Sequence, residues 1–334
     1  MVHKCIHVGV GGRGVWPWRA FAQRQDFQAW LLADIRPDHL EHARDACGLP
    51  AAHCFGSMAE AMDSSLAGEA DTVIVITPPD LHAPMCLEAV RRGMHVMVEK
   101  PFTKSLAQAR LIVEEAERRG VRVFVTQNAR LGAAAWTLAR LTRQQVYGRP
   151  VFGLMTKAGW RPGVHHSGQD DHAYLWERGI HDFDTLRWIF AAEPRRISCL
   201  SFNPPWSPYR GGAGAHAWIE FRGGATCAYS SNFCAHAGGD ALGVECERAS
   251  LQVVGHQIRV VHQASKETQV LALDQVPSVE QTMLDLFCAY LEDGIEPPSS
   301  GRGNLWTVAM VEAGALSSEE GRIVDVGELL GTQA

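Results

Sequence analysis

The sequence lacks the features that mark several large classes of protein. Its 334 residues contain no run of about 18 uninterrupted apolar residues, so no membrane-spanning helix is expected. Lys and Arg number 31 against 37 for Asp and Glu, and the net charge of -6 disfavours nucleic acid and anionic membranes as partners. The first residues reach glycine before an apolar signal segment can form. A cytoplasmic protein is therefore expected.

The cysteine pattern excludes two further classes. The nine cysteines form no CxxC pair that would hold zinc and no dense disulfide framework. Their scatter indicates reduced thiols in a cytosolic protein, and no metal ion is predicted. With 46% hydrophobic and 20% charged residues, the composition is that of an ordinary globular protein. The length suits two domains of roughly 150 residues each.

In the first part of the chain, short apolar runs alternate with helix-like segments. The runs are residues 5–10, 30–35, 71–77, 94–100 and 121–127. Helical patterns occupy 37–47, 80–93 and 105–120, with Asp80 and Ser105 as candidate N-caps and Gly93 and Gly120 just past the ends. This alternation predicts a doubly wound parallel sheet, an α/β domain over residues 1–127.

From residue 128 onward the pattern changes. A helix candidate at 132–145 and a strand-like run at 150–160 precede a polar loop and a helix near 179–191. Strand-like runs follow at 195–202, 215–221, 225–231 and 251–263, joined by glycine-rich turns such as RGG and AGG. Helical patterns at 278–294 and 304–321 and a short strand at 322–326 close the chain. The interpretation is an α+β domain over 128–334 with a large, mostly antiparallel sheet, whose terminal helix could pack back on the first domain.

The segment GVGGRG indicates a nucleotide site. Gly9, Gly11 and Gly14 have GxGxxG spacing directly after the first strand, where backbone amides at a helix start can approach a pyrophosphate. Asp34 ends the second strand, where a carboxylate would accept hydrogen bonds from the adenine ribose. Asp34 would repel a 2'-phosphate, which favours NAD, whereas Arg36 could attract one, which leaves NADP open.

Three strand ends meet at the same edge of the predicted sheet. Ligands of a doubly wound sheet bind beyond the carboxyl ends of its strands, so Thr77, Lys100 and Gln127 should lie beside the pyrophosphate loop. Pro101 fixes the turn after Lys100 and is a candidate for a cis peptide bond. The alternative for Lys100 is a solvated strand-end cation.

A second cluster lies in WERGIHDFDTLRWIF, residues 176–190. If 179–191 is helical, Ile180, Phe183 and Leu186 belong to a buried stripe. His181 and Asp184 then share another face, beside the core. Glu177 precedes His181 by four residues and could orient its imidazole or bind a substrate hydroxyl. The alternative is a hydrogen-bonded structural histidine.

The polar loop before this cluster is the predicted place of substrate contacts. Its acidic and imidazole side chains could hydrogen-bond several hydroxyls, and Trp160, Trp176 or Trp206 could stack on a sugar ring. Each of these residues could instead belong to a solvated loop. The polar candidates are His165, His166, Asp170, Asp171 and His172.

These motifs together resemble one known family. GxGxxG at 9–14, Asp34, TPPDLH at 77–82, EKP at 99–101 and ERGIHDFDTLRW at 177–188 are similar to the glucose-fructose oxidoreductase/inositol dehydrogenase (Gfo/Idh/MocA) family. The resemblance spans nearly the whole chain, including the tail SSEEGRIVDV. Its motif lysine and histidine fall on Lys100 and His181. The acid before that histidine is usually Asp in the family and is Glu177 here.

The resemblance implies an N-terminal Rossmann domain, a C-terminal domain whose open sheet forms homodimer or homotetramer contacts, and NAD(P)-dependent redox chemistry on a sugar or cyclitol hydroxyl. Lys100, His181 and Glu177 are the predicted catalytic residues. The predicted cofactor-binding residues are Gly9, Gly11, Gly12, Arg13, Gly14, Asp34, Arg36, Thr77, Pro78, His82, Glu99, Lys100 and Gln127. The predicted substrate-binding residues are Lys100, Trp160, His165, His166, Asp171, His172, Glu177 and His181.

Three other functions stay open at this point. The His/Asp cluster could ligate a divalent metal in a hydrolase, although HExxH spacing is missing. The protein could be a cofactor-binding regulator that has lost catalysis. It could also be a redox-neutral enzyme, such as an epimerase or glycosidase, that recycles tightly held NAD.

Overall fold

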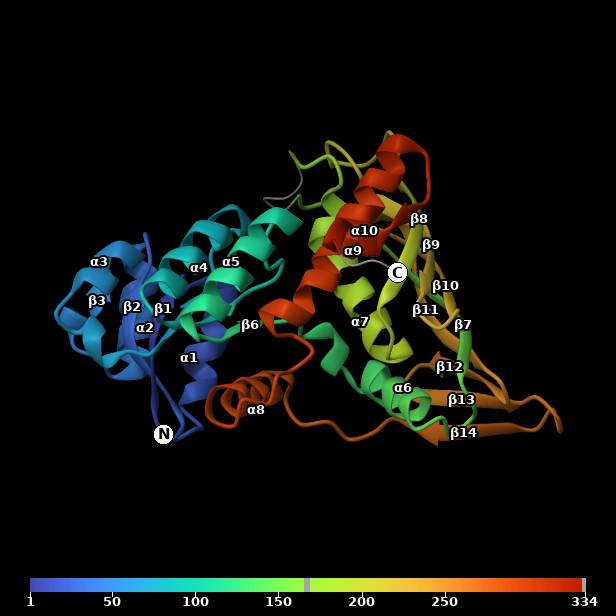
Figure 1. Cartoon of the computed structure of the whole chain (residues 1–334), viewed down its shortest axis with the longest axis horizontal. Helices are drawn as coiled ribbons and strands as arrows, with labels where there is room; N and C mark the ends of the chain where they lie inside the picture. Colours follow the sequence, from blue (N-terminus) through green and yellow to red (C-terminus); the bar gives the residue numbers. More distant parts are fainter. Residues whose placement is uncertain (165–168, 332–334) are drawn as a thin grey trace. The chain divides into compact units, whose positions relative to one another are not determined.

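The computed structural model describes residues 1–164 and 169–331, and the chain divides into two compact units. Unit 1 comprises Met1–Gln127 and Pro277–Leu305, and unit 2 comprises Asn128–Val276 and Trp306–Ala334. Figure 1 labels most of their helices and strands. Each unit is therefore built from segments that lie far apart in the sequence.

Unit 1 contains a parallel sheet of six strands in the order β3-β2-β1-β4-β5-β6. All its neighbouring strand pairs are parallel, which confirms the predicted α/β class. The order reverses at β1, as in a doubly wound dinucleotide-binding fold. The short strand β3 was not predicted. The strands are β1 (His3–Val8), β2 (Phe27–Ala33), β3 (Cys54–Phe55), β4 (Thr72–Val75), β5 (His95–Val98) and β6 (Val123–Val125).

Local sequence signals fix most helix ends of unit 1. The side chain of Ser105 caps α5 by accepting from the Gln108 amide, and Gly120 ends that helix with φ +69°, as predicted. The prediction that Asp80 caps the next helix was wrong, because residues 79–81 form a 3-10 turn and Leu81 holds the N-cap position. The helices are α1 (Val15–Phe21), α2 (Pro37–Cys47), α3 (Met58–Asp63), α4 (His82–Arg91), α5 (Leu106–Arg119) and α8 (Val279–Glu292).

Helix α8 packs on the sheet of unit 1 through phenylalanines. The ring of Phe287 stacks on Phe27 of β2 with centroids 5.9 Å apart and tilts against Phe124 of β6 at 5.4 Å. Phe27 also stacks on Phe21 of α1. Such aromatic pairs add to the burial of large apolar surfaces. The returning segment is thereby held on the same core as β1 and β2.

Unit 2 contains a sheet of nine strands in the order β14-β13-β12-β11-β7-β10-β9-β8-β15. Its neighbours are antiparallel except for β7 and β10, which confirms the predicted mostly antiparallel sheet. The strands are β7 (Pro150–Trp160), β8 (Pro194–Phe202), β9 (Gly214–Phe221), β10 (Thr226–Asn232), β11 (Cys234–Cys246), β12 (Ala249–Val254), β13 (Gln257–His262), β14 (Thr268–Ala272) and β15 (Val324–Asp325).

One glycine pair misled the sequence-based turn assignment. The RGG turn is real, with Gly223 and Gly224 at φ +90° and +88°. The AGG segment at 237–239 lies inside β11 instead, where the register with β7 shifts between Cys234 and Gly239. Glycine inside a strand often marks such a bulge, so the residue type alone did not separate a turn from an irregular strand.

The helices of unit 2 include the predicted histidine helix. They are α6 (Ala133–Arg143), α7 (Ile180–Phe190), α9 (Gly301–Glu320, of which residues 306–320 belong to this unit) and α10 (Val326–Leu330). A π-helical turn, Leu175–Gly179, leads directly into α7. Single π turns occur frequently at functional sites, and this one carries Glu177.

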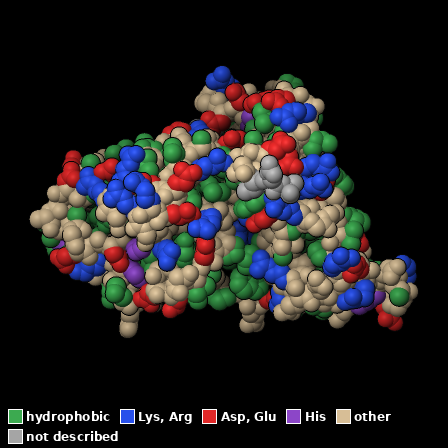
Figure 2. All heavy atoms as spheres, in the orientation of Figure 1, with side chains coloured by type: hydrophobic (Ala, Val, Ile, Leu, Met, Phe, Trp, Pro, Cys, Tyr) green, Lys and Arg blue, Asp and Glu red, His purple; other side chains and the backbone are tan. Residues whose placement is uncertain are grey.

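The described residues contain no helix long and apolar enough to cross a membrane. All nine cysteines are free thiols. On the face shown in Figure 2, acidic and basic side chains are interspersed. This distribution agrees with the weak net charge of the sequence.

A buried histidine lies under the glycine loop of unit 1. His7 in β1 is fully buried, and neither of its ring nitrogens has a hydrogen-bond partner among the described residues. Burial lowers the pKa of His7 to about 3, although the nearby Asp34 charge opposes this effect. His7 is therefore neutral in the folded protein at pH values well above 3.

We predict that His7 makes the protein acid-sensitive. Because the unfolded pKa is about 6.5, the unfolded chain binds the extra proton first. Stability should fall as pH drops from 6.5 toward 3, by about 1.4 kcal/mol per pH unit from this group. The variant His7→Leu should lose this part of the pH dependence in urea unfolding. The same change at the exposed His42 of α2 should keep it, and equal slopes for both variants would contradict the prediction.

Candidate functional site

The glycine loop of unit 1 lets neighbouring backbone segments pack closely against one another. Gly9 has φ +81°, and a Cβ there would lie 2.1 Å from the Ile76 carbonyl oxygen. A Cβ on Gly14 would lie 1.7 Å from the Gly9 oxygen. Larger residues would therefore push β1, β4 and the start of α1 apart. The His39 ring fills the space beside Gly11, whereas Gly12 has no other atom within 4 Å of a Cβ position. The backbone at Gly12 is therefore open toward a ligand at the edge of the sheet.

Asp34 is anchored beside this loop. Its Oδ2 accepts hydrogen bonds from the Val10 amide at 2.9 Å and the Gly11 amide at 3.3 Å, and its Oδ1 accepts from the Arg36 amide. A cavity of about 340 Å³ opens next to it, lined by the loop and the ends of β2 and β4. The predicted residues Gly9, Gly11, Gly12, Asp34, Arg36, Thr77 and Pro78 all line this cavity.

Several apolar residues of this cavity were missed by sequence reasoning. Ile35, Met58, Leu81 and Met85 supply its walls. These apolar side chains suit the flat faces of an adenine ring, whereas the carboxylate of Asp34 suits the hydroxyls of a ribose. Only Leu81 could have been found from sequence, because it lies within the TPPDLH motif.

The side chain of Arg36 is already paired. Its guanidinium donates to both carboxylate oxygens of Asp38, at 3.0 and 2.7 Å. His39 Nδ1 lies 3.4 Å from Asp34 Oδ2 on the other side of the carboxylate. Asp34 favours NAD, and Arg36 could favour NADP by attracting a 2'-phosphate. Because Asp38 already pairs with Arg36, the attraction of Arg36 for a 2'-phosphate is reduced.

The charged pair after β5 has two different environments. Glu99 is buried, accepts a hydrogen bond from Thr126 Oγ1 at 2.9 Å, and lies 3.7 Å from Arg13 Nε of the glycine loop. Burial raises the pKa of the Glu99 carboxyl, while Arg13 and Lys100 oppose that shift. Lys100 is half-buried, and its bond to Pro101 is cis, as predicted. Glu99 therefore joins the glycine loop to the strand end that carries Lys100.

Two further predicted residues lie at this edge. Gln127 follows β6 and is 2% exposed, and its side-chain amide has no hydrogen-bond partner among the described residues. His82 is fully buried, and its ring bridges the carbonyl oxygens of Thr77 and Pro101 at 2.9 and 2.7 Å. His82 thus fastens the loop after β4 to the loop after β5. Direct contact between His82 and a cofactor stays a prediction.

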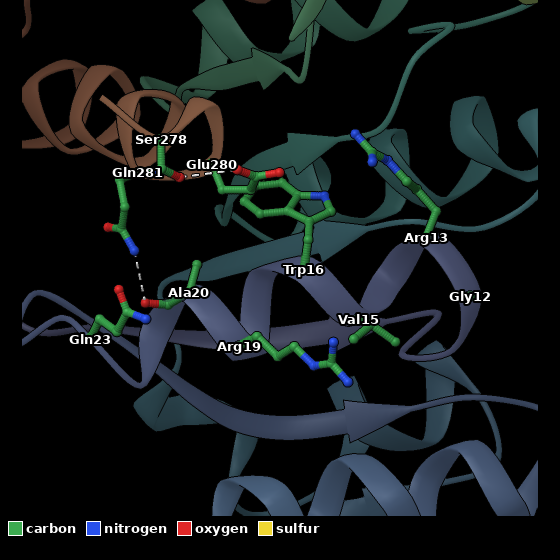
Figure 3. A pocket seen from close by; sticks show the side chains of 10 residues that line it. All are labelled: Gly12, Arg13, Val15, Trp16, Arg19, Ala20, Gln23, Ser278, Glu280 and Gln281. Atoms are coloured by element: carbon green, nitrogen blue, oxygen red, sulfur yellow. Dashed lines mark hydrogen bonds between the residues drawn. The ribbon is translucent and has the colours of Figure 1, made fainter. Parts of the chain in front are cut away.

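A second cavity lies on the other side of the glycine loop. Figure 3 shows this cavity of about 580 Å³, with Arg13, Trp16 and Arg19 on one wall and Ser278, Glu280 and Gln281 on the other. Gln281 donates to the Ala20 carbonyl at 3.3 Å, which holds the start of α8 against α1. Gly12 lines both cavities. The loop therefore has open space on two sides.

In unit 2, α7 is buried on nearly all sides. The expectation of one buried stripe with His181 on a more accessible face was wrong, because His181 is 8% exposed and Asp184 is fully buried. Asp184 accepts a bidentate ion pair from the buried Arg130 and a 3.0 Å hydrogen bond from Thr307. The face of α7 that carries Asp184 is therefore covered by Arg130 and Thr307. Asp184 is thereby a structural residue.

Asp182 is the centre of a second buried cluster beside His181. Its carboxylate accepts from Lys157 Nζ at 2.8 Å and from the Tyr229 hydroxyl at 2.9 Å, and Arg178 lies 3.5 Å away. Lys157 and Tyr229 were not predicted. The two-residue period of β7 was the available signal, because it puts Lys157 on the same inward face as Met155.

The remaining predicted substrate residues are spread over several elements. Glu177 in the π turn forms an ion pair with Arg161. His172 Nε2 lies 3.0 Å from Glu319 of α9, and Asp171 is exposed. The rings of Trp160 and Trp206 flank His236, with centroids 5.7 and 5.5 Å from it. His165 and His166 lie outside the described residues.

The observations in unit 1 define a class of protein. A reversed strand order, a glycine loop at the carboxyl end of β1 and an anchored acid at the end of β2 are the parts of a dinucleotide-binding domain. The mostly antiparallel sheet of unit 2 adds a buried histidine helix. This combination is that of a two-domain oxidoreductase.

Comparison with family models gives the family. Residues 3–127 match the model described as "Oxidoreductase family, NAD-binding Rossmann fold", and residues 136–252 match the "GFO/IDH/MocA C-terminal domain". The chain belongs to the GFO/IDH/MocA oxidoreductase family, and its Rossmann domain is NAD-binding. The resemblance found in the motifs is confirmed.

Individual relatives cover much of the chain. A D-apiose dehydrogenase from Paraburkholderia graminis is 27% identical over 338 residues, covering 92% of this chain and 88% of that protein. The scyllo-inositol 2-dehydrogenase (NAD(+)) of Bacillus subtilis is 30% identical over 162 residues, 46% of each chain. An Agrobacterium radiobacter oxidoreductase solved with NAD+, L-tartaric acid and magnesium has the same fold, with a TM-score of 0.85, 19% identity and 98% and 100% coverage.

The residues present fit the NAD that the family requires. Gly9, Gly11 and Gly14 leave no room for a Cβ. The cavity beside Asp34 has apolar walls, and the Gln127 amide is buried without a hydrogen-bond partner among the described residues. Buried polar groups are normally hydrogen-bonded, so such an amide at a ligand edge suits a ligand contact. Asp34, Thr77 and Pro78 would hold the adenosine half, and the loop amides would hold the pyrophosphate.

We predict that Asp34 sets cofactor choice. Asp34→Asn keeps an acceptor and the shape but removes the charge, so NAD affinity should fall about 10- to 100-fold, the cost of one or two charge-assisted hydrogen bonds. NADP affinity should stay equal or rise. Fluorescence titration with both nucleotides measures the ratio. Adding Asp38→Asn, which frees Arg36, should shift the ratio further toward NADP, and an unchanged ratio in both variants would contradict the assignment.

Proposed function

We propose that this protein transfers a hydride between NAD and a secondary hydroxyl, or the corresponding ketone, of a sugar, sugar derivative or cyclitol. The observation that carries the proposal is the position of Lys100, at the same sheet edge as the glycine loop and the Asp34 cavity. The names of the relatives, which act on D-apiose and scyllo-inositol, support this substrate class.

In this proposal residues 1–127 bind the cofactor, together with the returning segment Pro277–Leu305 of unit 1, and the other residues of 128–334 bind the substrate. His181 takes the hydroxyl proton as general base while the carbon-bound hydrogen leaves as hydride. Lys100 stabilises the developing alkoxide by its positive charge. Bound NAD supplies the hydride acceptor. The mechanism requires that both side chains reach one substrate when it is bound.

Other residues of unit 2 would bind and orient the substrate. Glu177 lies in the π turn four residues before His181 and pairs with Arg161. In this proposal Glu177 fixes the π turn or accepts a hydrogen bond from a substrate hydroxyl. The Trp160–His236–Trp206 stack offers aromatic faces for a sugar ring. Asp171 and His172 remain proposed hydroxyl contacts, as do His165 and His166.

We predict that Lys100→Ala and His181→Ala each lower turnover by about 10²- to 10⁴-fold, because each removes a group that acts on the reacting hydroxyl. NAD affinity should change little. The assay follows NADH formation with a panel of aldoses, glycosides and inositols, and fluorescence titration follows NAD binding.

Matched controls exist on the same units. Lys104→Ala removes a lysine paired with Asp80, and His216→Ala removes an exposed histidine of β9, so both should keep normal turnover. Near-normal turnover in Lys100→Ala or His181→Ala would refute these roles. Tight NAD binding without NADH from any substrate would favour redox-neutral catalysis or a regulator.

The outer face of the unit 2 sheet supports an oligomer as part of the proposal. Phe152 and Leu154 of β7 are 52% and 47% exposed, and Trp218 of β9 is 53% exposed. The register puts Leu154, Ala228 and Trp218 in one row across adjacent strands. Contiguous apolar patches of this kind mark interaction surfaces, and we assign this one to a second copy of the chain. A cytoplasmic location agrees with the nine free cysteines.

We predict that Trp218→Glu shifts the protein toward the monomer, because burying the new carboxylate in an apolar interface is costly. Light scattering coupled to gel filtration measures the mass. Leu111→Glu changes an equally exposed residue of α5 and should leave the mass unchanged. A wild-type mass equal to one chain would disprove the assembly.

A further inference from the structure

Three side chains meet at the amino end of the unit 1 sheet, opposite the cofactor edge. His3 begins β1, and Cys288 and Glu292 lie one helical turn apart at the end of α8. Among the described residues these three form a group whose nitrogen, sulfur and oxygen atoms all lie within 4.8 Å of one another. His3 Nε2 is 3.7 Å from Glu292 Oε1. Residues four apart on a helix share a face, so both α8 side chains point the same way.

His3 presents an unused ring nitrogen to this group. The residue is 4% exposed, and its Nε2 is buried without a hydrogen-bond partner. Its Nδ1 lies 2.6 Å from Asp71 Oδ2. Because a carboxylate only accepts, Nδ1 carries the proton, and the lone pair of a neutral ring is on Nε2. A carboxylate on the far nitrogen is the usual partner of a metal-bound histidine.

The electrostatics of the group favour a cation. Glu292 and the terminal carbonyls of α8 contribute negative charge, and a helix C-terminus stabilises positive charge. Arg24 pairs with Asp26 and Asp285. Its positive charge also acts on Cys288, whose thiol hydrogen-bonds to Asp26. The exposed amino group of Met1 lies 2.7 Å from Glu292 Oε1, so this carboxylate already pairs with one cation.

The positions of these side chains are fixed by the core beneath them. The His3 ring is tilted against Phe27 with centroids 5.4 Å apart, and Phe287, next to Cys288, stacks on Phe27 at 5.9 Å. The β1 strand and the α8 helix are therefore held in register by one aromatic stack. A ligand set carried on rigid elements loses little entropy when an ion binds.

We propose that His3 Nε2, Cys288 Sγ and Glu292 bind one zinc ion, with solvent as the fourth ligand and Asp71 as the partner that orients the histidine. Nitrogen, sulfur and carboxylate oxygen are the donors that zinc takes, at bond lengths of about 2.0–2.3 Å. Such bonds put ligand atoms about 3.3–3.6 Å apart in a tetrahedron, so small rotamer changes close the group. Zinc displaces the thiol proton of Cys288 as it binds.

This site would join the first strand to the returning segment of the chain. It lies one strand length, about 17 Å, from the glycine loop, so it takes no part in the redox chemistry. Zinc would tie α8 to β1 and thereby stabilise the unit that binds the cofactor. Ligands that bind only the folded state raise its stability by mass action.

The test uses the full-length protein, freed of metal with a chelator, equilibrated with zinc chloride and passed through gel filtration. Mass spectrometry of the metal should give one zinc per chain, with a raised unfolding temperature. Cys288→Ser and Glu292→Gln should each weaken zinc binding at least tenfold, and Asp71→Asn should weaken it about 10- to 100-fold. Cys246→Ser, a half-buried cysteine of β11, should bind zinc normally.

Cobalt(II) provides a second readout. A thiolate ligand gives an intense charge-transfer band in the near ultraviolet, which should be present in the wild type and in Cys246→Ser and absent from Cys288→Ser. Glu292 is exposed, so Glu292→Gln reports on binding without disturbing the core. Less than one zinc per chain, or full zinc binding by Cys288→Ser, would overturn the proposal.

Discussion

The reversal of strand order at β1 is the constraint on which the cofactor half of the molecule depends. With β2 on one side and β4 on the other, the helices after β1 and β4 leave in opposite directions and open a crevice above β1. Parallel pairing brings every carboxyl end to that edge. The glycine loop, Asp34, Thr77, Lys100 and Gln127 therefore lie along one edge, although more than 110 residues separate the first from the last. Glu99 and His82 then fasten adjacent loops to one another.

The features that could be predicted from sequence are those determined within a few residues. Glycine at positions 9 and 14 is predictable because a tight turn leaves no space for a side chain there. Ser105 is predictable as an N-cap because the first amides of a helix need a side-chain acceptor. The alignment of Asp34 with the loop needed only one further rule, that parallel strands share an edge. For these reasons the fold class and the cofactor half of the site can be predicted from the sequence alone.

The rest depends on contacts between distant segments, which local patterns do not contain. Arg130 pairs with Asp184 across 54 residues, and Lys157 meets Asp182 only because β7 lies under α7. The burial of His181 therefore came as a correction. Strand β11 was missed because glycine signals turns and bulges alike. Likewise, His3 and Cys288 lie at opposite ends of the sequence, and no local pattern connects them. The cysteines were therefore interpreted as reduced thiols without a ligand role.

The π turn at Leu175–Gly179 changes what a spacing of four residues means. Across an α-helix, four residues return almost to the same side, whereas a π turn holds one residue more per turn. Glu177 and His181 are four apart along a segment that contains this wider winding. The loss of one residue here would rotate the preceding segment about 100° around the helix axis relative to His181. In evolutionary terms, the geometry before the histidine is more sensitive to an insertion or deletion than to the exchange of Asp for Glu.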